Sequence, residues 1–224
     1  MLKFNVLTLR SRNQRDCSGT RIPVLGSAVY IFLLASILFI LCAGPAEAGA
    51  PLEQIKGTVD KVLEILRDKS FKKPGMEELR RKKLRETIEA RFNFEEIGRR
   101  ALGLYWRKRT PDERKEFTAL FSRIIEKAYI KKIEAYSDEK IVYTDENIDD
   151  GYATVRTKII TAVNTEIPIE YRLLSKEGRW EVYDVVIEGV SLVNNYRMQF
   201  SSILHSKPYA YLVKVMKAKV AKKD

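Results

Sequence analysis

Apolar side chains in the first part of the chain recur at steps of three and four residues, which is the period of an amphipathic helix. One such run covers residues 52–66 and follows Pro51, a residue suited to the first turn of a helix. The Lys-Lys-Pro-Gly sequence at residues 72–75 should interrupt the chain. We then expect a highly charged helix with few apolar anchors over about residues 76–90, and a short helix that ends near Gly103.

The longest predicted helix begins at Thr110 and runs to about Tyr136. Thr110 can cap its first turn, Pro111 fits the first helical position, and Glu113 completes a capping box. Its apolar stripe keeps the helical period along its length and consists of Phe117, Leu120, Phe121, Ile124, Ile125, Ala128, Tyr129, Ile133 and Tyr136.

After residue 138 the apolar period falls from 3.6 to 2, which predicts β-strands. Four strands are expected, near residues 141–143, 153–163, 169–173 and 180–187, and two helices, at about residues 192–204 and 208–220, follow them. The fourth strand is apolar on both faces and should lie inside the sheet. We expect Trp180, Val182 and Val186 on one of its faces and Tyr183, Val185 and Ile187 on the other.

Helices, then a four-stranded antiparallel meander, then helices again predict an α+β fold. A strongly twisted sheet with one polar face curls around the helices that cover its apolar face, so we expect a cone-shaped pocket there. The same apolar residues could instead build an ordinary solid core, and composition does not distinguish the two.

The N-terminal segment has the pattern of a secretory signal. Residues 22–46 contain no charged side chain and follow five basic residues. An apolar run at residues 28–43 and the Ala46-Glu47-Ala48 sequence are typical of a cleaved signal peptide. We therefore expect residues 1–48 to be the signal peptide and residues 49–224 to be one exported domain. An inner-membrane anchor is the alternative, because the apolar run is long enough to span a bilayer.

Composition excludes most catalytic chemistry. Beyond residue 48 the chain has no cysteine, one histidine (His205) and 36 basic against 28 acidic residues, a net charge of +8. Disulfides, thiol nucleophiles and cysteine-based metal sites are excluded there, and a histidine-rich metal site or Ser-His-Asp triad is nearly so. No phosphate-binding glycine loop, nucleophile elbow or zinc-protease motif occurs. We expect no catalytic residue, no metal and no cofactor.

Asp184 is the carboxylate on which a catalytic hypothesis can rest, because it interrupts an otherwise apolar strand. In small cone-shaped folds an inward Asp with a Tyr partner can act as a general base. The alternative is that Asp184 points to the sheet edge or accepts hydrogen bonds from Tyr or Arg.

Basic residues lie beside aromatic ones at residues 105–109, Tyr-Trp-Arg-Lys-Arg, a pattern that in a cytoplasmic protein suits single-stranded nucleic acid. Behind a signal peptide we expect no nucleic acid, and we favour an anionic membrane surface or an acidic protein, with a solvated helix end as the alternative. Arg107, Lys108 and Arg109 are therefore candidate contacts to a partner or a lipid head group. The same interpretation applies to Lys214, Lys217, Lys219, Lys222 and Lys223.

Two long segments carry distinctive motifs in a fixed order. Residues 92–136 contain Asn93-Phe94, Leu102-Gly103, Tyr105-Trp106, Thr110-Pro111, Phe117, Phe121 and the pair Tyr129 and Tyr136. Residues 169–200 contain Tyr171-Arg172, Trp180, Tyr183-Asp184-Val185, Glu188-Gly189-Val190-Ser191 and Asn195-Tyr196-Arg197. In these motifs the chain resembles the MlaC family, also called the toluene-tolerance auxiliary family.

The resemblance implies a periplasmic phospholipid-binding shuttle. Such a protein carries lipid between an inner-membrane ABC transporter complex and an outer-membrane lipoprotein complex, and so maintains the lipid asymmetry of the outer membrane. The implied fold is a curved, nuclear-transport-factor-2-like sheet that packs with a helical bundle and encloses an apolar pocket. Glycerophospholipid and hopanoid-like cargo both stay open, as do a cone-fold enzyme using Asp184 and an adaptor that binds no lipid.

The pocket that the resemblance implies can be assigned to the predicted apolar faces. On the sheet we expect its lining to be Val155, Ile159, Ile169, Tyr171, Leu173, Trp180 and Val182. On the long helix we expect Phe117, Phe121, Ile124 and Tyr129.

Overall fold

The structure, a computed structural model, describes residues 50–136 and 138–222, all within one compact unit that spans Glu47–Asp224. The predicted signal peptide lies outside the described residues. The helices and strands follow in the order α2 (Pro51–Arg67), η1 (Lys69–Lys72), α3 (Glu77–Glu89), α4 (Phe94–Leu102), η2 (Gly103–Lys108), α5 (Pro111–Glu134), β1 (Lys140–Asp149), β2 (Tyr152–Ile160), β3 (Glu166–Lys176), β4 (Arg179–Ile187), β5 (Val190–Ser191), α6 (Leu192–Ser206) and α7 (Tyr209–Ala221).

The predicted helix starts are confirmed. Pro51 occupies the first turn of α2, and Thr110 and Glu113 form the capping box of α5. Asn93 and Ser191 cap α4 and α6 with their side chains. These caps give partners to backbone N–H groups that a first helical turn leaves unbonded. Among the described helices, none combines the length and the apolar character that crossing a bilayer requires.

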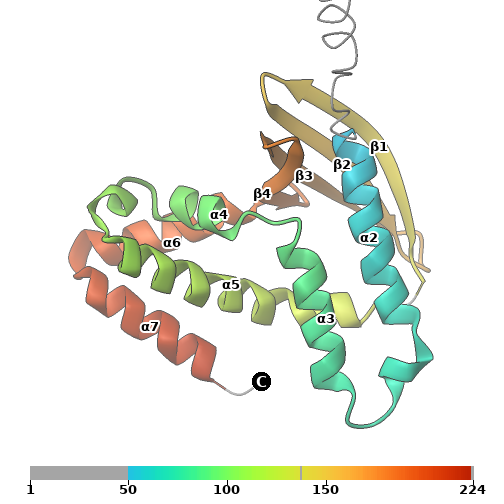
Figure 1. Cartoon of the computed structure of the whole chain (residues 1–224), viewed down its shortest axis with the longest axis horizontal. Helices are drawn as coiled ribbons and strands as arrows, with labels where there is room; N and C mark the ends of the chain where they lie inside the picture. The colour runs from blue at the N-terminus through green and yellow to red at the C-terminus, as the bar shows by residue number, and fades with distance from the viewer. Residues whose placement is uncertain (1–49, 137, 223–224) are drawn as a thin grey trace, which may run out of the picture. The chain divides into compact units, whose positions relative to one another are not determined.

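The α+β fold and the curved antiparallel sheet are confirmed, but the predicted number of strands is wrong (Figure 1). The described residues form five strands in the order β1-β2-β3-β4-β5. The additional strand, β5, pairs Val190 and Ser191 with the end of β4. A strand of two residues is too short to show an apolar period. The nuclear-transport-factor-2-like topology stays a prediction.

Tight turns fix the register of the hairpins. At the tips of the β1–β2 and β3–β4 hairpins, Gly151 and Gly178 both have φ 77°, and the residues before them, Asp150 and Glu177, have φ 39° and 50°. Positive φ at both central residues matches the right-handed twist of the adjoining strands, and glycine adopts it without steric cost. Each hairpin therefore closes through a two-residue turn, Asp150-Gly151 in the first and Glu177-Gly178 in the second.

A bulge in β4 changes which side chains face the helices. Tyr183 has no partner in the β3–β4 ladder, so the alternation of faces reverses there. Val185 and Ile187 consequently share a face with Trp180 and Val182. The predicted separation of these four residues onto two faces is wrong, because a period of 2 cannot reveal an inserted residue. Their face is continuous with Leu173, Tyr171 and Ile169 of β3.

The core has three parts. The inner face of the sheet packs against α2, which lies along the strands (Figure 1). Helices α4 to α7 form a bundle with its own core around Phe117, Phe121 and Phe200. A small apolar cluster joins α2, α3 and α5 through Leu66, Leu84 and Ile130.

Candidate functional site

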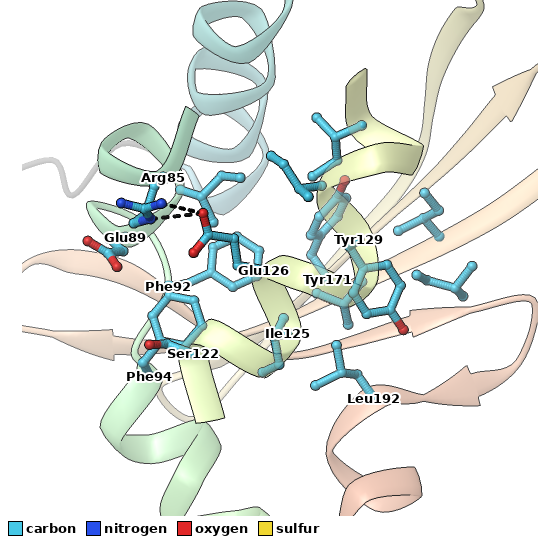
Figure 2. A pocket seen from close by; sticks show the side chains of 16 residues that line it. Arg85, Glu89, Phe92, Phe94, Ser122, Ile125, Glu126, Tyr129, Tyr171 and Leu192 are labelled. Atoms are coloured by element: carbon cyan, nitrogen blue, oxygen red, sulfur yellow. Dashed lines mark hydrogen bonds and ion pairs between the residues drawn. The ribbon is translucent and has the colours of Figure 1, made fainter. Parts of the chain in front are cut away.

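A cavity of about 220 Å³ lies between the inner face of the sheet, α3 and α5, with Phe92, α4 and the start of α6 closing its sides (Figure 2). Its wall is almost wholly apolar. The lining residues are Arg85, Ile88, Glu89, Phe92, Phe94, Ser122, Ile125, Glu126, Tyr129, Ile130, Ile133, Ile169, Tyr171, Val185, Ile187 and Leu192.

The β4 bulge determines the sheet side of the cavity. It turns Val185 and Ile187 to the inner face, opposite Tyr171 and Ile169 of β3. Without the extra residue, both β4 side chains would point to the other face of the sheet. Burial raises the pKa of Tyr171 to about 12, because an apolar surrounding disfavours the charged phenolate.

Helix α5 has two adjacent apolar faces, and one of them lines the cavity. Ile125, Tyr129 and Ile133, at steps of four residues, line the cavity and are half-buried. Phe117 and Phe121 are fully buried against the helical bundle. The broad apolar stripe predicted for this helix therefore divides between a packed core and a hollow.

A short extended segment and the first residue of α4, which follows it, supply two aromatic rings. Backbone hydrogen bonds of 2.9 Å join Val182 of β4 to both Arg91 and Asn93, so this segment runs beside the strand. The pairing places the Phe92 and Phe94 rings at the cavity wall, stacked with their centroids 6.0 Å apart.

Polar groups gather at one end of the cavity (Figure 2). Arg85 Nη2 lies 2.6 Å from Glu126 Oε1, and Arg85 Nε donates to the same oxygen at 2.9 Å. This hydrogen bonding raises the pKa of Arg85, so its guanidinium stays charged. Glu89, which is exposed, and Ser122 lie at the same end. An apolar interior with charged groups at one end suits an amphipathic ligand.

The predicted pocket residues divide among three places. Tyr129, Ile169 and Tyr171 line the cavity. Phe117, Phe121 and Ile124 are buried in the helical bundle. Val155, Leu173, Trp180 and Val182 are buried beneath α2, and half-buried Ile159 lies outside the cavity lining. Lipid contact stays a prediction for all of them.

Sequence analysis missed the contribution of α3 and the far end of β4. Arg85, Ile88 and Glu89 come from a helix that is too charged to indicate an apolar site. Val185 and Ile187 were assigned to the wrong face because the bulge was not foreseen. Ile125 and Ile133 belonged to the predicted α5 stripe, and its unusual width was the available signal.

Asp184 lies outside the cavity lining, 4% exposed, and anchors α6 to the sheet. Its Oδ2 accepts a hydrogen bond from the Ser191 hydroxyl at 2.6 Å, and its Oδ1 accepts one from the Val193 N–H at 3.0 Å. Arg172 Nη1 is 3.4 Å from Oδ2. A carboxylate at a helix N-terminus is a stabilising arrangement, and these contacts account for an acidic residue in this strand.

The predicted basic contacts also differ among themselves. Arg107 and Lys108 are exposed on η2. Arg109 instead hydrogen-bonds Glu113 at 3.2 Å and lies over the Tyr209 ring, 4.4 Å from its centroid. None of the three lines the cavity, so contact with a lipid head group or a partner stays a prediction for them.

Curated relatives agree with the resemblance seen in the motifs. The chain is 31% identical over 130 residues to the intermembrane phospholipid transport system binding protein MlaC of Haemophilus influenzae, a match that covers 55% of this chain and 60% of the relative. It is 28% identical over 101 residues to the toluene tolerance protein ttg2D of Pseudomonas putida, covering 45% of this chain and 47% of that protein. The chain thus aligns with about half of the length of each relative.

A solved structure shares the fold. The phospholipid-binding protein from Ralstonia solanacearum, solved in complex with a phospholipid, superposes with a TM-score of 0.70 at 21% identity, covering 77% of this chain and 98% of that one. The family model for the MlaC protein matches residues 56–218, which includes the cavity and both motif segments. The chain therefore belongs to the MlaC family.

Proposed function

We propose that this protein is a periplasmic phospholipid carrier that moves lipid between an inner-membrane ABC transporter complex and an outer-membrane lipoprotein complex, and so maintains outer-membrane lipid asymmetry. The observation that carries the proposal is the apolar cavity with Arg85, Glu89 and Glu126 at one end. A relative named for intermembrane phospholipid transport and a similar fold solved with a phospholipid support the same cargo.

Physical chemistry explains why such a carrier needs a cavity and no catalytic group. Burying a methylene stabilises it by about 0.8 kcal/mol, so two acyl chains with roughly 30 methylenes are held in a bilayer by about 24 kcal/mol. A barrier of that size corresponds to spontaneous escape at about 10⁻⁵ per second. A protein that replaces one apolar environment with another makes the transfer nearly isoenergetic.

The cavity must enlarge to hold a whole lipid, and α3 is the element best placed to move. Small-molecule pockets usually measure about 300–1,000 Å³, more than the 220 Å³ seen here. Helix α3 has one fully buried side chain, Leu84, and ion pairs join it to α5. We propose that α3 swings outward as acyl chains enter.

The primary test is the lipid content of residues 49–224 purified from the periplasm without detergent. Native mass spectrometry and thin-layer chromatography of an extract should find phospholipid bound to the chain. Folded protein that carries none, and takes up none from vesicles, would contradict the proposal. If that lipid-free protein still bound the inner-membrane complex in a pull-down, an adaptor would be the better description.

A matched pair of variants locates the lipid. Val185→Trp places an indole in the cavity, whereas Val186→Trp places it on the opposite face of the same strand. We expect the first variant to lose bound lipid and the second to keep it, with thermal melts verifying that both fold. Equal lipid loading of the two folded variants would place the lipid elsewhere.

Localisation is tested separately. The N-terminal sequence of the protein released by osmotic shock should begin at Gly49. A product that stays in the membrane fraction with its N-terminus intact would indicate an anchored carrier.

A further inference from the structure

Helix α7 carries apolar side chains on its exposed surface as well as on its buried side. Leu212, Val213 and Met216 face the helical bundle and are buried. On the outer side, Tyr211 is 44% exposed and Val215 is 37% exposed. A helix that packs on one side of a globular protein usually carries polar residues on the other, so this outer stripe is unusual.

Lysines surround the outer stripe of α7. The five lysines of residues 206–222 are all exposed, and this segment contains neither an acidic residue nor an arginine. Only Lys217 forms an ion pair within the described residues, with exposed Glu116 at 2.7 Å, and Lys207 lies 5.9 Å from the centroid of the Tyr211 ring. The five residues are Lys207, Lys214, Lys217, Lys219 and Lys222.

We infer that this outer face of α7 docks on an anionic phospholipid bilayer. Lysine stems can lie along the surface while their ammonium groups meet lipid phosphates, and a tyrosine between them suits the boundary between head groups and acyl chains. Each lysine near an anionic leaflet contributes about 1 kcal/mol of attraction. A protein partner fits less well, because protein–protein interfaces are enriched in arginine and depleted in lysine.

The α7 face is separate from the cavity. No α7 residue lines the cavity, and α7 packs on α5 and α6 at the edge of the bundle (Figure 1). Docking through α7 would therefore hold the protein at a membrane without occupying the lipid site. This inference stands apart from lipid carriage, and either can fail without the other.

Flotation of the mature protein with vesicles at low ionic strength tests the inference. Wild type should bind vesicles of equal parts phosphatidylglycerol and phosphatidylcholine, should not bind phosphatidylcholine alone, and should dissociate as salt is added. The combined variant Lys207→Gln, Lys214→Gln and Lys222→Gln should bind about 100-fold more weakly. Lys217 and Lys219 are left in place because they contact Glu116 and Tyr196.

A charge-matched control separates a specific face from net charge. Lys69→Gln, Lys72→Gln and Lys73→Gln remove three exposed lysines at and beside η1, which lies well away from α7 (Figure 1). This control should bind anionic vesicles almost as wild type does. An equal loss in both triple variants would overturn the inference, because net charge would then drive binding.

Wild type that fails to float with the anionic vesicles would also overturn the inference. If that protein were nevertheless retained on polyglutamate beads, the result would identify an acidic protein as the partner. Lipid content, measured on the same samples, should be unchanged in both triple variants and reports separately on carriage.

Discussion

The two ends of the sheet's inner face differ in packing although the same strands build them. At one end, which we call the packed end, Val155, Leu173 and Val182 lie beneath α2 with no exposed surface. At the other, the cavity end, similar aliphatic and aromatic side chains line a hollow beneath α3 and α5. They are Ile169, Tyr171, Val185 and Ile187, all half-buried.

The covering helix explains the difference. Helix α2 contributes Leu52, Ile55 and Val59 to the packed end. Helix α3 has the sequence EELRRKKLRETIE and contributes mainly the stems of charged residues, with Ile88 as its apolar lining residue. A hollow remains where a charged helix covers an apolar sheet, since no side chain of matching volume fills the space. A ligand site can thus arise because the covering helix has too few apolar side chains to fill the space above the sheet.

The largest expected effect is on stability at the packed end. Leu173→Ala should lower the free energy of unfolding by about 3 kcal/mol, because it opens a new void in a filled core. Ile169→Ala, on the same strand and face, should cost only about 1 kcal/mol, because its side chain already borders a hollow. Urea unfolding of lipid-free protein measures both. Equal losses would mean that the two ends are packed alike.

Replacing an arginine should also cost more unfolding free energy at the packed end than at the cavity end. Arg91 donates to the Trp180 carbonyl at 2.8 Å and to the Thr58 hydroxyl at 3.2 Å, and burial lowers its pKa. Arg91→Met leaves those acceptors without a donor and should cost about 2 kcal/mol. Arg85→Met, beside the solvent-facing Glu89, should cost less than about 1 kcal/mol. The same unfolding titrations compare the two, and a larger loss for Arg85 would contradict the comparison.

Local sequence signals predicted the elements well. Thr110, Pro111 and Glu113 identified the start of α5, because such a motif satisfies backbone requirements within a few residues. Pattern alone could not reveal the β4 bulge at Tyr183, because its position depends on pairing with a strand that lies elsewhere in the sequence.

The cavity was harder to predict than the fold. Its lining draws on α3, α5, β3 and β4, and whether an apolar residue borders a void depends on the volume of the side chains opposite it. Phe121 and Tyr129 belong to one predicted stripe, yet the first is fully buried in the bundle and the second lines the cavity. The sequence indicates which faces are apolar, whereas the gap beneath α3 becomes evident only when the elements are assembled.

A smaller effect is expected from loosening the cover of the cavity end. Glu126→Gln keeps the shape of the side chain but removes the charge that pairs with Arg85. The free energy of unfolding should fall by only about 0.5 kcal/mol, because the ion pair is partly exposed to solvent. Lipid transfer between vesicles should become faster, because α3 opens more often.

An ion pair elsewhere on α5 supplies the control. Glu116→Gln removes the partner of Lys217, away from the cavity. Its transfer rate should match wild type. If Glu126→Gln were equally unchanged, the Arg85 pair would not restrain the opening of α3.

The smallest expected effect is a pH dependence of the contact that holds α3 against α5. Glu134 accepts hydrogen bonds from Arg80 at 2.9 Å and from Arg81 at 3.0 Å. Burial raises the pKa of Glu134, but the hydrogen bonds and charges of the two arginines outweigh burial and hold it below its ordinary value of 4.5. Because the folded-state pKa is the lower one, the contact contributes its full stability above pH 4.5 and loses it as the pH falls through the folded-state pKa.

Hydrogen exchange of α3 amides should report this loss at the cavity end. Below pH 4.5, exchange in wild type should accelerate by about twofold relative to Glu134→Gln, in which the contact is already weakened at every pH. Glu86→Gln removes an exposed carboxylate from α3 itself, 3.9 Å from Lys82, and should keep the wild-type profile. If Glu134→Gln kept that profile too, the acid response would come from another group, and the Glu134 contacts would not be what holds the charged helix over the hollow.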